Sequence, residues 1–451
     1  MLPLSGKIAY GMGRFGSSLL LTLLSLTSFL VYGTVFELNW FLAGVALGIS
    51  YVIIGLTHWL TGYYSDKLIS PLGRRKPFVI VGAPGLAISG IMVFIPDRFI
   101  DITSPGIELS VFLYYLVFLG LFKFFYAFLL TAYQAWLPEI TDEVERPLVS
   151  SMQNVSNWLA NGIGVVFAFI TPLLFVTSPP ALSELGLTMF VVFAVVEILF
   201  YLPSIVLIRE RPGLTVPQRN LVYETRVALQ NRTFVVWTLV VGFLSFSFSA
   251  ITAQVVGFAQ KVLMLNTIEL LLPPALSFLG GIIIFLFVWL RAIRRYGKKR
   301  TMMLSLVLLT LLLPLTPVVA AATSLMSSQI LAVMWLVPVG ACMAVYYIMS
   351  YIVPADIAQV DEILTQESRS GIYTGFIGVP LNFFQAWASI LLGLFMDFTK
   401  SSTGSDVFGL TWWGPVFAPF LLIAAYFLLK IDIDPDFEHL RRVLRPPPVD
   451  P

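Results

Sequence analysis

The feature that most constrains this chain is a series of twelve long apolar runs separated by short polar loops. An α-helix needs about 20 consecutive apolar residues to cross the hydrocarbon core of a bilayer. The runs lie near residues 8–32, 41–65, 78–96, 109–137, 151–177, 185–208, 233–262, 269–292, 302–323, 329–353, 371–398 and 410–430. With 12% charged residues, the chain carries about half the charge of a soluble globular protein. The sequence therefore predicts an all-α integral membrane protein with twelve transmembrane helices.

The basic residues are sorted to one side of these spans. Of the 27 Lys and Arg residues, the loops of the other side hold only Arg98, Lys261 and Lys400, while Lys123 lies inside a span. Because Lys and Arg gather in cytoplasmic loops, we predict a multi-pass plasma membrane protein with both termini in the cytoplasm. The dispersed basic residues argue against nucleic acid as a partner. The single cysteine, Cys342, rules out a disulfide within the chain.

The longest polar connection, residues 209–232, divides the spans into six and six. The predicted domains are an N-terminal six-helix bundle over residues 1–208, a cytoplasmic linker over 209–232, a C-terminal six-helix bundle over 233–430 and a cytoplasmic tail over 431–451. Such a division is typical of transporters built from two related halves.

A weak internal repeat supports this division. The basic cluster at 291–300 follows the eighth span as the cluster at 73–76 follows the second, and residues 354–358 follow the tenth span as 138–142 follow the fourth. Two pseudo-symmetric bundles around a central cavity predict alternating access, with the substrate site near the midplane between the halves.

The loop between the second and third spans places an acid, a turn and four basic residues in a short stretch. Asp66 ends the second span, and Arg74 and Arg75 follow once the chain has doubled back, so an ion pair is within reach. Gly62 allows a neighbouring helix to approach closely. We predict that Asp66, Arg74 and Arg75 form a gating latch. The alternative is that the loop only fixes the topology.

Four motifs stand in a fixed order across both halves, at residues 7–13, 62–78, 137–146 and 355–371. They resemble motifs of the glycoside–pentoside–hexuronide:cation symporters, a family of the major facilitator superfamily. The second motif is also similar to that of the sucrose:proton symporters, a branch of the same group. The resemblance implies the major facilitator fold and sugar uptake driven by a cation gradient.

Acidic residues that build the cation site in the sodium-using members of that family have no counterpart here. The corresponding positions are Ser18, Ile54, His58 and Leu130. Because sodium prefers charged oxygen ligands, the resemblance implies no sodium or other metal site, and the coupling ion is expected to be a proton. An arginine and a lysine of those members fall on Asn154 and Asn382.

Three ionisable residues inside the spans are candidates for proton coupling: His58, Glu197 and Lys123. Imidazole changes its charge near neutral pH, and an acid or ammonium inside a membrane is a functional candidate because it is costly to place there. Pairing of Lys123 with Glu197 would neutralise both. The alternatives are a neutral His58 bonded to a backbone carbonyl and a protonated Glu197 bonded within its own half.

Sugar binding requires aromatic faces for the ring and amides or hydroxyls for the sugar hydroxyls. The candidates for substrate binding are Tyr126, Tyr133, Gln134, Asn154, Asn157, Asn161, Gln254, Tyr346, Asn382 and Gln385. The three asparagines of the fifth span follow each other at three- and four-residue spacing, which places them on one helix face. The alternative is that these polar side chains bond neighbouring helices together.

These features predict a secondary active transporter that imports a neutral glycoside with protons by alternating access. A disaccharide such as sucrose, maltose or trehalose fits the amides at the charged positions of the family. The alternatives are an uncoupled sugar facilitator and the same fold carrying a lysolipid or pigment-like amphiphile. An enzyme is disfavoured, because the sequence offers no metal cluster, nucleophile motif or second membrane histidine. The expected partners are the glycoside, the proton and the bilayer, without a cofactor, and the expected state is a monomer.

Overall fold

The computed structural model describes residues 3–435 apart from 69, 103, 143, 209, 211–220, 366–372 and 374–375. Long apolar helices dominate this part of the chain. Eleven of the described helices are long and apolar enough to cross a membrane, and α3 (Lys76–Met92) is a shorter apolar helix. The twelve spans that the sequence predicted thus correspond to eleven full-length helices and one short one.

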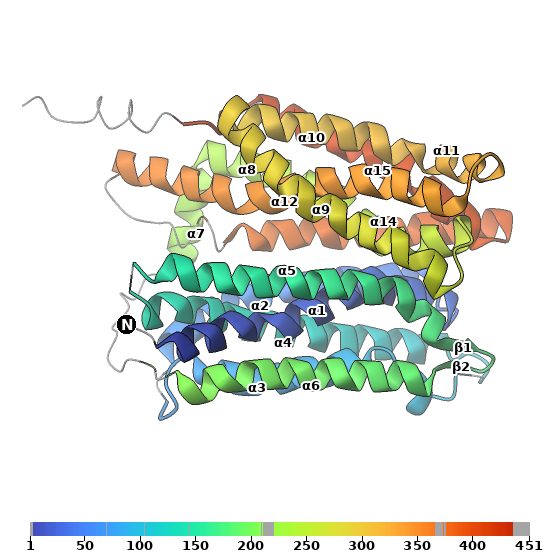
Figure 1. Cartoon of the computed structure of the whole chain (residues 1–451), viewed down its shortest axis with the longest axis horizontal. Helices are drawn as coiled ribbons and strands as arrows, with labels where there is room; N and C mark the ends of the chain where they lie inside the picture. Colours follow the sequence, from blue (N-terminus) through green and yellow to red (C-terminus); the bar gives the residue numbers. More distant parts are fainter. Residues whose placement is uncertain are drawn as a thin grey trace, which may run out of the picture.

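The first six apolar helices lie together in one half of the molecule (Figure 1). They are α1 (Leu4–Thr34), α2 (Trp40–Lys67), α3, α4 (Glu108–Ile140), α5 (Arg146–Ile170) and α6 (Glu184–Leu207), with the short helix η1 (Pro96–Arg98) after α3. α1 packs against α5 and α6, while α2 and α3 pack against α4. The approach of α6 to α1 is close, because a Cβ on Gly16 would lie 2.4 Å from the Cα of Glu197. Glycine at this position lets the backbones of α1 and α6 approach closely.

A small β-hairpin joins α5 to α6. After α5 come the short helix η2 (Thr171–Leu174) and the antiparallel strands β1 (Phe175–Thr177) and β2 (Pro180–Leu182). The sequence predicted one continuous span over 151–177. The α-helix ends earlier because Pro172 has no backbone donor and its ring clashes with the preceding turn of a helix.

The remaining helices form the other half of the molecule (Figure 1). They are α7 (Leu221–Gln230), α8 (Arg232–Gly257), the π-helix η3 (Phe258–Val262), α9 (Ile268–Tyr296), α10 (Lys298–Leu312), η4 (Leu313–Leu315), α11 (Thr316–Ala321), η5 (Ala322–Ser324), α12 (Ser328–Thr365), α14 (Gly378–Thr403) and α15 (Asp406–Leu429). α9 packs on α12, and α15 packs on α8 and α10. Between the halves, α2 packs along α14 and α1 along α8.

Two segments are more helical than the sequence predicted. α7 lies inside residues 209–232, which were predicted as a polar linker. α12 runs on to Thr365 through Pro354, whereas the predicted span ended at residue 353. Pro138 likewise lies inside α4. A proline removes one backbone hydrogen bond, and a helix held by tertiary packing can continue past it. The division into two bundles and a linker stays a prediction.

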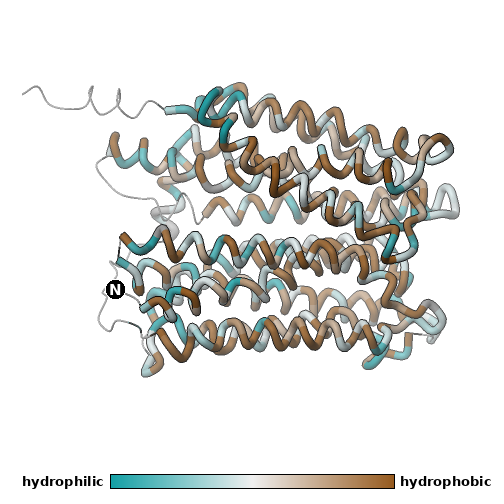
Figure 2. Tube along the Cα trace, in the orientation of Figure 1, coloured by the Kyte–Doolittle hydropathy of each residue, from teal (hydrophilic) through white to brown (hydrophobic). Residues whose placement is uncertain are grey.

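The two ends of the helices differ in charge. α1 begins and α15 ends at the same end of the molecule, where α3 and α10 also begin, with the basic residues 74–76 and 298–300 (Figure 1). We call this the basic end and the other the opposite end. Figure 2 shows apolar residues along most of the helix lengths and polar residues gathered at both ends. The apolar band between the ends is the part suited to hydrocarbon.

Candidate functional site

At the basic end, ion pairs hold the connection between α2 and α3. Arg75 donates to Asp66 and to Glu139 of α4, with 2.7 Å from its Nη2 to Oε1 of Glu139, and Arg74 Nη2 lies 2.6 Å from the same oxygen. Arg75 also donates to the Ser65 hydroxyl, and only 3% of Arg75 is exposed. The contact between Asp66 and Arg75 that the sequence predicted is therefore present.

Glu210, directly after α6, binds the start of α3. Its carboxylate accepts hydrogen bonds from the backbone N–H groups of Arg74, Arg75 and Lys76, the last two at 2.9 and 2.7 Å. Donors in the first turn of a helix lack partners within the helix, and the helix dipole favours a negative charge there. Gly73 precedes them with a φ of 104°, and a Cβ on it would lie 2.4 Å from Oε2 of Glu210. Glycine is the residue that fits.

We call this group the N-terminal clamp. Its members are Ser65, Asp66, Gly73, Arg74, Arg75, Glu139 and Glu210. It ties the basic ends of α2, α3, α4 and α6 to one another.

The loop between α9 and α10 has the same construction. Lys298 Nζ lies 2.7 Å from Oδ2 of Asp356 on α12. Asp434, after α15, accepts hydrogen bonds from the backbone N–H groups of Lys298 at 2.7 Å and Lys299 at 2.9 Å. Gly297 has a φ of 84°, and a Cβ on it would lie 2.9 Å from Oδ2 of Asp434. We call Gly297, Lys298, Lys299, Asp356 and Asp434 the C-terminal clamp.

The sequence revealed only part of these clamps. The internal repeat matched the two basic clusters with each other and the segments 138–142 and 354–358 with each other. It did not predict that each basic cluster contacts the acidic segment of its own half. Glu139, Glu210 and Asp434 were missed as partners. The available signal was an acidic residue directly after the sixth and the last span.

At the opposite end, three hydrogen bonds join the two halves. Asn39 Nδ2 donates to Oδ1 of Asp397 at 2.8 Å, and Trp40 Nε1 donates to Oδ1 of Asp406 at 2.8 Å. In addition, Gln260 Nε2 donates to the backbone carbonyl of Phe169 at 2.9 Å. The opposite end is therefore bridged by bonds from the start of α2 and its capping residue to α15 and α14, and from η3 to α5.

Next to the hydrogen bonds of Asn39 and Trp40, further along the helices, small residues let α2 and α14 pack closely. A Cβ on Gly44 would lie 2.5 Å from the carbonyl oxygen of Ser389, and a Cβ on Gly393 would lie 2.5 Å from the carbonyl oxygen of Trp40. Backbone contact of this kind is typical of membrane helices that pack through glycine. The contact extends to Gly55, where a Cβ would lie 3.2 Å from Cβ of Asn382.

Two of the candidates for proton coupling, Lys123 and Glu197, lie deep in the N-terminal half. Lys123, midway along α4 and 2% exposed, has its Nζ 3.4 Å from Oγ of Ser25 on α1 and 4.9 Å from the ring centre of Tyr51 on α2. Glu197 of α6 is fully buried against Gly16 of α1. Neither carboxylate oxygen of Glu197 has a hydrogen-bond partner among the described residues.

The pairing of Lys123 with Glu197 that the sequence suggested is wrong. Within the described residues, no carboxylate lies within 4.0 Å of the Lys123 ammonium, which is directed toward Ser25 and Tyr51 instead. Helix rise predicts depth along each helix but says nothing of the helix face. The face of α6 that carries Glu197 meets α1 rather than α4.

His58 on α2 bonds to α4. Its Nδ1 lies 2.6 Å from Oγ1 of Thr131, and the hydroxyl of Thr131 donates to the carbonyl of Ala127. The tautomer that fits this arrangement has Nδ1–H of His58 donating to Thr131, and in that tautomer Nε2 is the nitrogen that would take up a further proton. The ring also meets Tyr126 edge to face at 6.3 Å.

The asparagines of α5 bond to α1. Oδ1 of Asn157 accepts from Ser18 at 2.6 Å, and Oδ1 of Asn161 accepts from Thr22 at 2.9 Å. These bonds match the alternative in which polar residues hold neighbouring helices together. Asn154, nearer the basic end, is exposed.

The other candidates for sugar binding are dispersed. Tyr133 is buried, stacks on Tyr10 and donates to its backbone carbonyl, while Gln134 is exposed. Gln254 of α8 is fully buried, and neither atom of its amide has a partner among the described residues. On α14, Gln385 is half-buried and Asn382 donates to the carbonyl of Gly378 in its own helix.

An aromatic group lies at the boundary between the halves. Trp158 of α5 meets Tyr347 of α12 edge to face at 5.9 Å, and Phe248 of α8 packs on Tyr346 of α12 at 4.7 Å. Phe248 also meets Tyr347 at 5.5 Å. The sequence predicted Tyr346 as a binding residue and missed Trp158 and Phe248. Trp158 directly follows Asn157 of the α5 stripe, which was the available signal.

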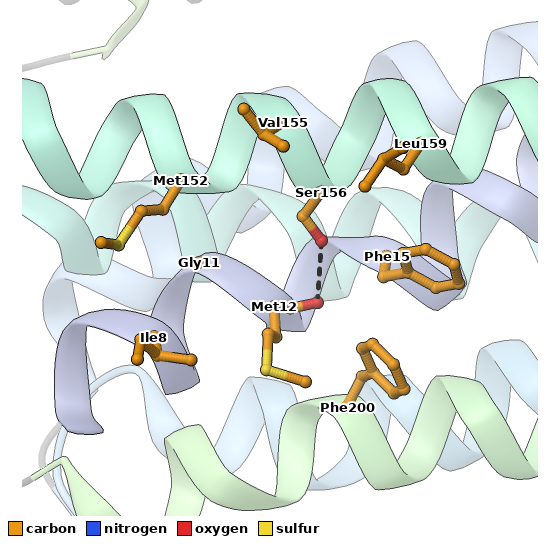
Figure 3. Close-up of a pocket in the computed structure, with 9 residues that line it drawn as sticks. All are labelled: Ile8, Gly11, Met12, Phe15, Met152, Val155, Ser156, Leu159 and Phe200. Atoms are coloured by element: carbon orange, nitrogen blue, oxygen red, sulfur yellow. Dashed lines mark hydrogen bonds between the residues drawn. The ribbon is translucent and has the colours of Figure 1, made fainter. Parts of the chain in front are cut away.

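A separate pocket of about 330 Å³ lies between α1, α5 and α6 near the basic end (Figure 3). Its lining residues are Ile8, Gly11, Met12, Phe15, Met152, Val155, Ser156, Leu159 and Phe200. Ser156, the one residue of this lining with a polar side chain, donates to the backbone carbonyl of Met12 at 3.3 Å. The pocket is therefore suited to an apolar group rather than to a sugar.

Comparison with known proteins gives a family match along almost the whole chain. A family model described as MFS/sugar transport protein matches residues 5–430. The putative sulfoquinovose importer of Escherichia coli (strain K12) is 29% identical over 142 residues, which are 31% of this chain and 29% of that protein. The aligned segment thus spans less than a third of this relative.

Solved structures are similar over nearly their whole length. The nucleoside transporter NupG has a TM-score of 0.64 at 14% identity and covers 94% of this chain, with 98% of that chain covered. A D-xylose–proton symporter also has a TM-score of 0.64, at 13% identity and 95% and 96% coverage. The bacterial homologue of the human lysosomal transporter Spinster, inward-facing and unoccupied, has a TM-score of 0.63 at 14% identity, with 95% of each chain covered. At these identities the likeness concerns the fold alone.

Proposed function

This chain belongs to the MFS/sugar transport protein family, and on that premise we propose that it imports a sugar together with a proton by alternating access. The observation that carries the proposal is the family match over residues 5–430, which includes every apolar helix described above. The fold is that of the major facilitator superfamily, and the similar solved structures named above are transporters.

The arrangement of contacts supports alternating access. Asn39, Trp40 and Gln260 bond the two halves at the opposite end, whereas each clamp at the basic end lies within one half. The excess of Lys and Arg supports a cytoplasmic basic end in the plasma membrane. The state described here would then be closed to the outside and directed toward the cytoplasm.

For the coupling proton, we propose His58 and Glu197 as the candidate carriers. Nε2 of His58 is available to take up a proton while Nδ1 bonds to Thr131. The side chain of Glu197 is enclosed without hydrogen-bond partners among the described residues, which favours the neutral carboxyl form and makes its deprotonation sensitive to any change at the α1–α6 contact.

For the cargo, we propose a glycoside held near the aromatic group of Trp158, Phe248, Tyr346 and Tyr347. Aromatic faces suit the C–H surface of a sugar ring, and these four come from both halves. The sequence alone suggested a neutral disaccharide. The relative from Escherichia coli is named for sulfoquinovose, a sugar that carries a sulfonate, so neutral and anionic sugars both belong in the assay.

A second candidate cargo is an amphiphile such as a lysolipid. One observation favours it, namely the apolar pocket between α1, α5 and α6, which would accept an alkyl chain (Figure 3). The buried polar side chains of Lys123 and Gln254 argue against this cargo, because an alkyl chain offers them no hydrogen-bond partner.

The test is uptake into proteoliposomes that hold the full chain, with an imposed inward proton gradient, with and without sodium. The labelled substrates are sucrose, maltose, trehalose and sulfoquinovose, with a lysolipid as the competing cargo. Sugar accumulation that an uncoupler abolishes and sodium leaves unchanged would support the proposal. His58→Ala and Glu197→Gln should then uncouple sugar movement from proton movement if they carry the proton.

Three other outcomes would contradict parts of the proposal. If sugar accumulation requires sodium, the coupling ion is sodium and not the proton. If the sugar equilibrates across the membrane without accumulating, the protein is an uncoupled facilitator. Lysolipid uptake in vesicles that take up no sugar would move the amphiphile to first place. Folding is monitored in each case by size-exclusion chromatography of the detergent-solubilised protein.

A further inference from the structure

The first long helix of each half ends in the same left-handed turn. Glu37, after α1, has a φ of 51°, and Met264, after η3, has a φ of 58°. Among the described residues, these two alone have a positive φ without being glycine. A residue with a Cβ is strained in this region, and such strain is often found in segments that change conformation. We call residues 31–38 the N-terminal αL turn and residues 258–265 the C-terminal αL turn.

The hydrogen bonds of the two αL turns match position by position. Leu38 N–H donates to the carbonyl of Tyr32 at 2.9 Å, and Leu265 N–H donates to that of Ala259 at 3.1 Å. The residue before each strained one donates to the preceding carbonyl of its turn, at 3.2 Å in the N-terminal αL turn and 3.0 Å in the C-terminal one. These windings are wider than that of an α-helix, and such windings frequently mark functional positions. The two halves thus share one construction at the opposite end.

Each αL turn is bonded to the other half of the molecule. The side chains of Asn39 and Trp40, directly after the N-terminal αL turn, donate to aspartates of α14 and α15. Gln260, inside the C-terminal αL turn, donates to the backbone carbonyl of Phe169 of α5 at 2.9 Å. We propose that the two αL turns form a reciprocal latch that closes the opposite end, and that they leave the left-handed conformation when this end opens. This inference rests on the alternating access of the proposed function, and it identifies the segments that move.

Packing couples the N-terminal αL turn to its bond across the halves. Trp40 is fully buried, and a Cβ on Gly33 would lie 2.3 Å from its ring. The ring of Phe29 lies 5.1 Å from that of Trp40 on the other side of the same helix turn. Because the indole is enclosed by the last turns of α1, it cannot leave its aspartate by rotating alone. Opening of the opposite end therefore has to displace the end of α1.

The winding of η3 couples the C-terminal αL turn to its bond. Gln260 stands in this turn where Gly33 stands in the other, and it lies within the π-helix itself. A return from π-helical to α-helical winding removes one residue from a turn, which rotates the neighbouring side chains by up to about 100°. Such a rotation would direct the Gln260 amide away from α5. The bond to Phe169 and the strained winding therefore depend on each other.

The strain predicts opposite effects for two kinds of substitution. Bonds between the halves hold Glu37 and Met264 in the left-handed region while the opposite end is closed. Glycine adopts this region without strain, so glycine at either position should favour the closed form. Loss of a bond between the halves should favour the open form. A turn that only caps a helix would be the same in both forms, and glycine would then leave their ratio unchanged.

The experiment measures the distance between the halves at the opposite end by double electron–electron resonance of the full chain in lipid nanodiscs. Spin labels are attached at Ser110→Cys of α4 and Ser401→Cys of α14, both exposed positions. Cys342→Ala removes the native thiol from this background. Gln260→Leu should raise the ratio of open to closed molecules about threefold to tenfold, because one bond between the halves is lost.

The glycine variants are measured in the Gln260→Leu background, where the open form is populated. Met264→Gly should lower the ratio of open to closed molecules about fivefold, and Glu37→Gly should act in the same direction. The matched control is Leu325→Gly, which places a glycine in another exposed loop of the opposite end, at a φ of −106°. It should leave the ratio unchanged, because no left-handed strain is relieved there.

Asp397→Ala repeats the bond test outside both αL turns, since it removes the acceptor of Asn39. It decides the matter if Gln260→Leu does not fold, and the glycine variants are then measured in its background. An unchanged ratio in the bond variants, or in both glycine variants, would overturn the inference. Uptake by unlabelled wild type tests the proposed function separately. If wild type accumulates sugar while these ratios stay unchanged, the latch fails alone; if it takes up no sugar, the proposed function fails and the distances still decide the latch.

Discussion

The two clamps at the basic end are built on one plan with different chemistry. In the N-terminal clamp, Glu139 accepts from two arginines, and in the C-terminal clamp Asp356 accepts from one lysine. Glu210 accepts from three backbone N–H groups, of Arg74, Arg75 and Lys76 at the start of α3, whereas Asp434 accepts from two in the first turn of α10. Arginine offers a planar set of donors, while lysine acts as a single point charge. Equivalent positions in related halves can therefore differ in rigidity.

The difference suggests unequal roles in the transport cycle. Arg75 is almost fully enclosed and contacts Ser65, Asp66 and Glu139, which ties the ends of α2 and α4 to the start of α3. The C-terminal clamp ties α10 to α12 and to the end of α15 with fewer bonds. We expect the basic end of the N-terminal half to move as one rigid body, with more freedom in the other half. The following substitutions test this expectation.

The largest effect is expected for Arg75→Ala compared with Lys298→Ala. Arg75→Ala removes three side-chain partners from a buried position and should lower stability by about 3 kcal/mol, with loss of most uptake. Lys298→Ala removes one pair at a half-buried position and should cost about 1 kcal/mol. Thermal melting of the detergent-solubilised protein and sugar uptake measure the two effects. Equal losses in both variants would break the comparison.

The next effect concerns the shared carboxylates, tested by Glu139→Gln and Asp356→Asn. Each variant keeps its shape and loses its charge, so it isolates the ion pairs from packing. Glu139→Gln should slow uptake about tenfold because two arginines lose their common partner, and Asp356→Asn by about threefold or less. Initial rates at saturating substrate give the answer. A larger effect at Asp356 would mean that the C-terminal clamp is the stronger one.

A smaller effect is expected where the loops turn, in Gly73→Ala and Gly297→Ala. Both glycines have positive φ, which costs a residue with a Cβ about 1–2 kcal/mol. The added Cβ would lie 2.4 Å from the Glu210 carboxylate at Gly73, but 2.9 Å from that of Asp434 at Gly297. Gly73→Ala should therefore lower the melting temperature more. The control is Gly404→Ala, which has a φ of 73° and no atom near its added Cβ, and so reports the backbone cost alone.

The smallest effect is expected at the opposite end, for Lys400→Ala. Lys400 Nζ lies 3.4 Å from Asp406, and both side chains are partly exposed, so the pair contributes about 0.5 kcal/mol. Uptake and melting temperature should stay close to wild type. A large loss in this variant would show that the ion pairs at the opposite end, and not the clamps, limit the cycle.

The local part of the N-terminal clamp was readable from the sequence. Asp66 and Arg75 are joined by one short loop, so their contact followed from spacing alone. Glu139 and Glu210 lie on other helices, far along the chain, and their place depends on how α4 and α6 pack. The same limit explains the wrong pairing of Lys123 with Glu197, since equal depth in the membrane does not put two side chains on facing surfaces.

The asparagine stripe of α5 shows the same limit of prediction from sequence. The spacing placed Asn157 and Asn161 on one face, and the structure agrees, because both bond to α1. Whether a polar face meets a neighbouring helix or a cavity depends on which helix lies opposite, and that is set by packing. The sequence predicted the face but not its neighbour.

What the sequence determined by itself was the number and polarity of the apolar helices and the shared plan of the two basic clusters, because these follow from local hydropathy and charge. Only the tertiary structure decided the partners across the helices. These are Glu139 and Glu210 for the N-terminal clamp, the bonds of Asn39 and Trp40 to the other half, and the contacts of Lys123 with Ser25 and Tyr51 in place of the expected carboxylate. The physical reason is that hydropathy acts on each segment separately, whereas an ion pair requires two particular helix faces to meet within a few ångströms.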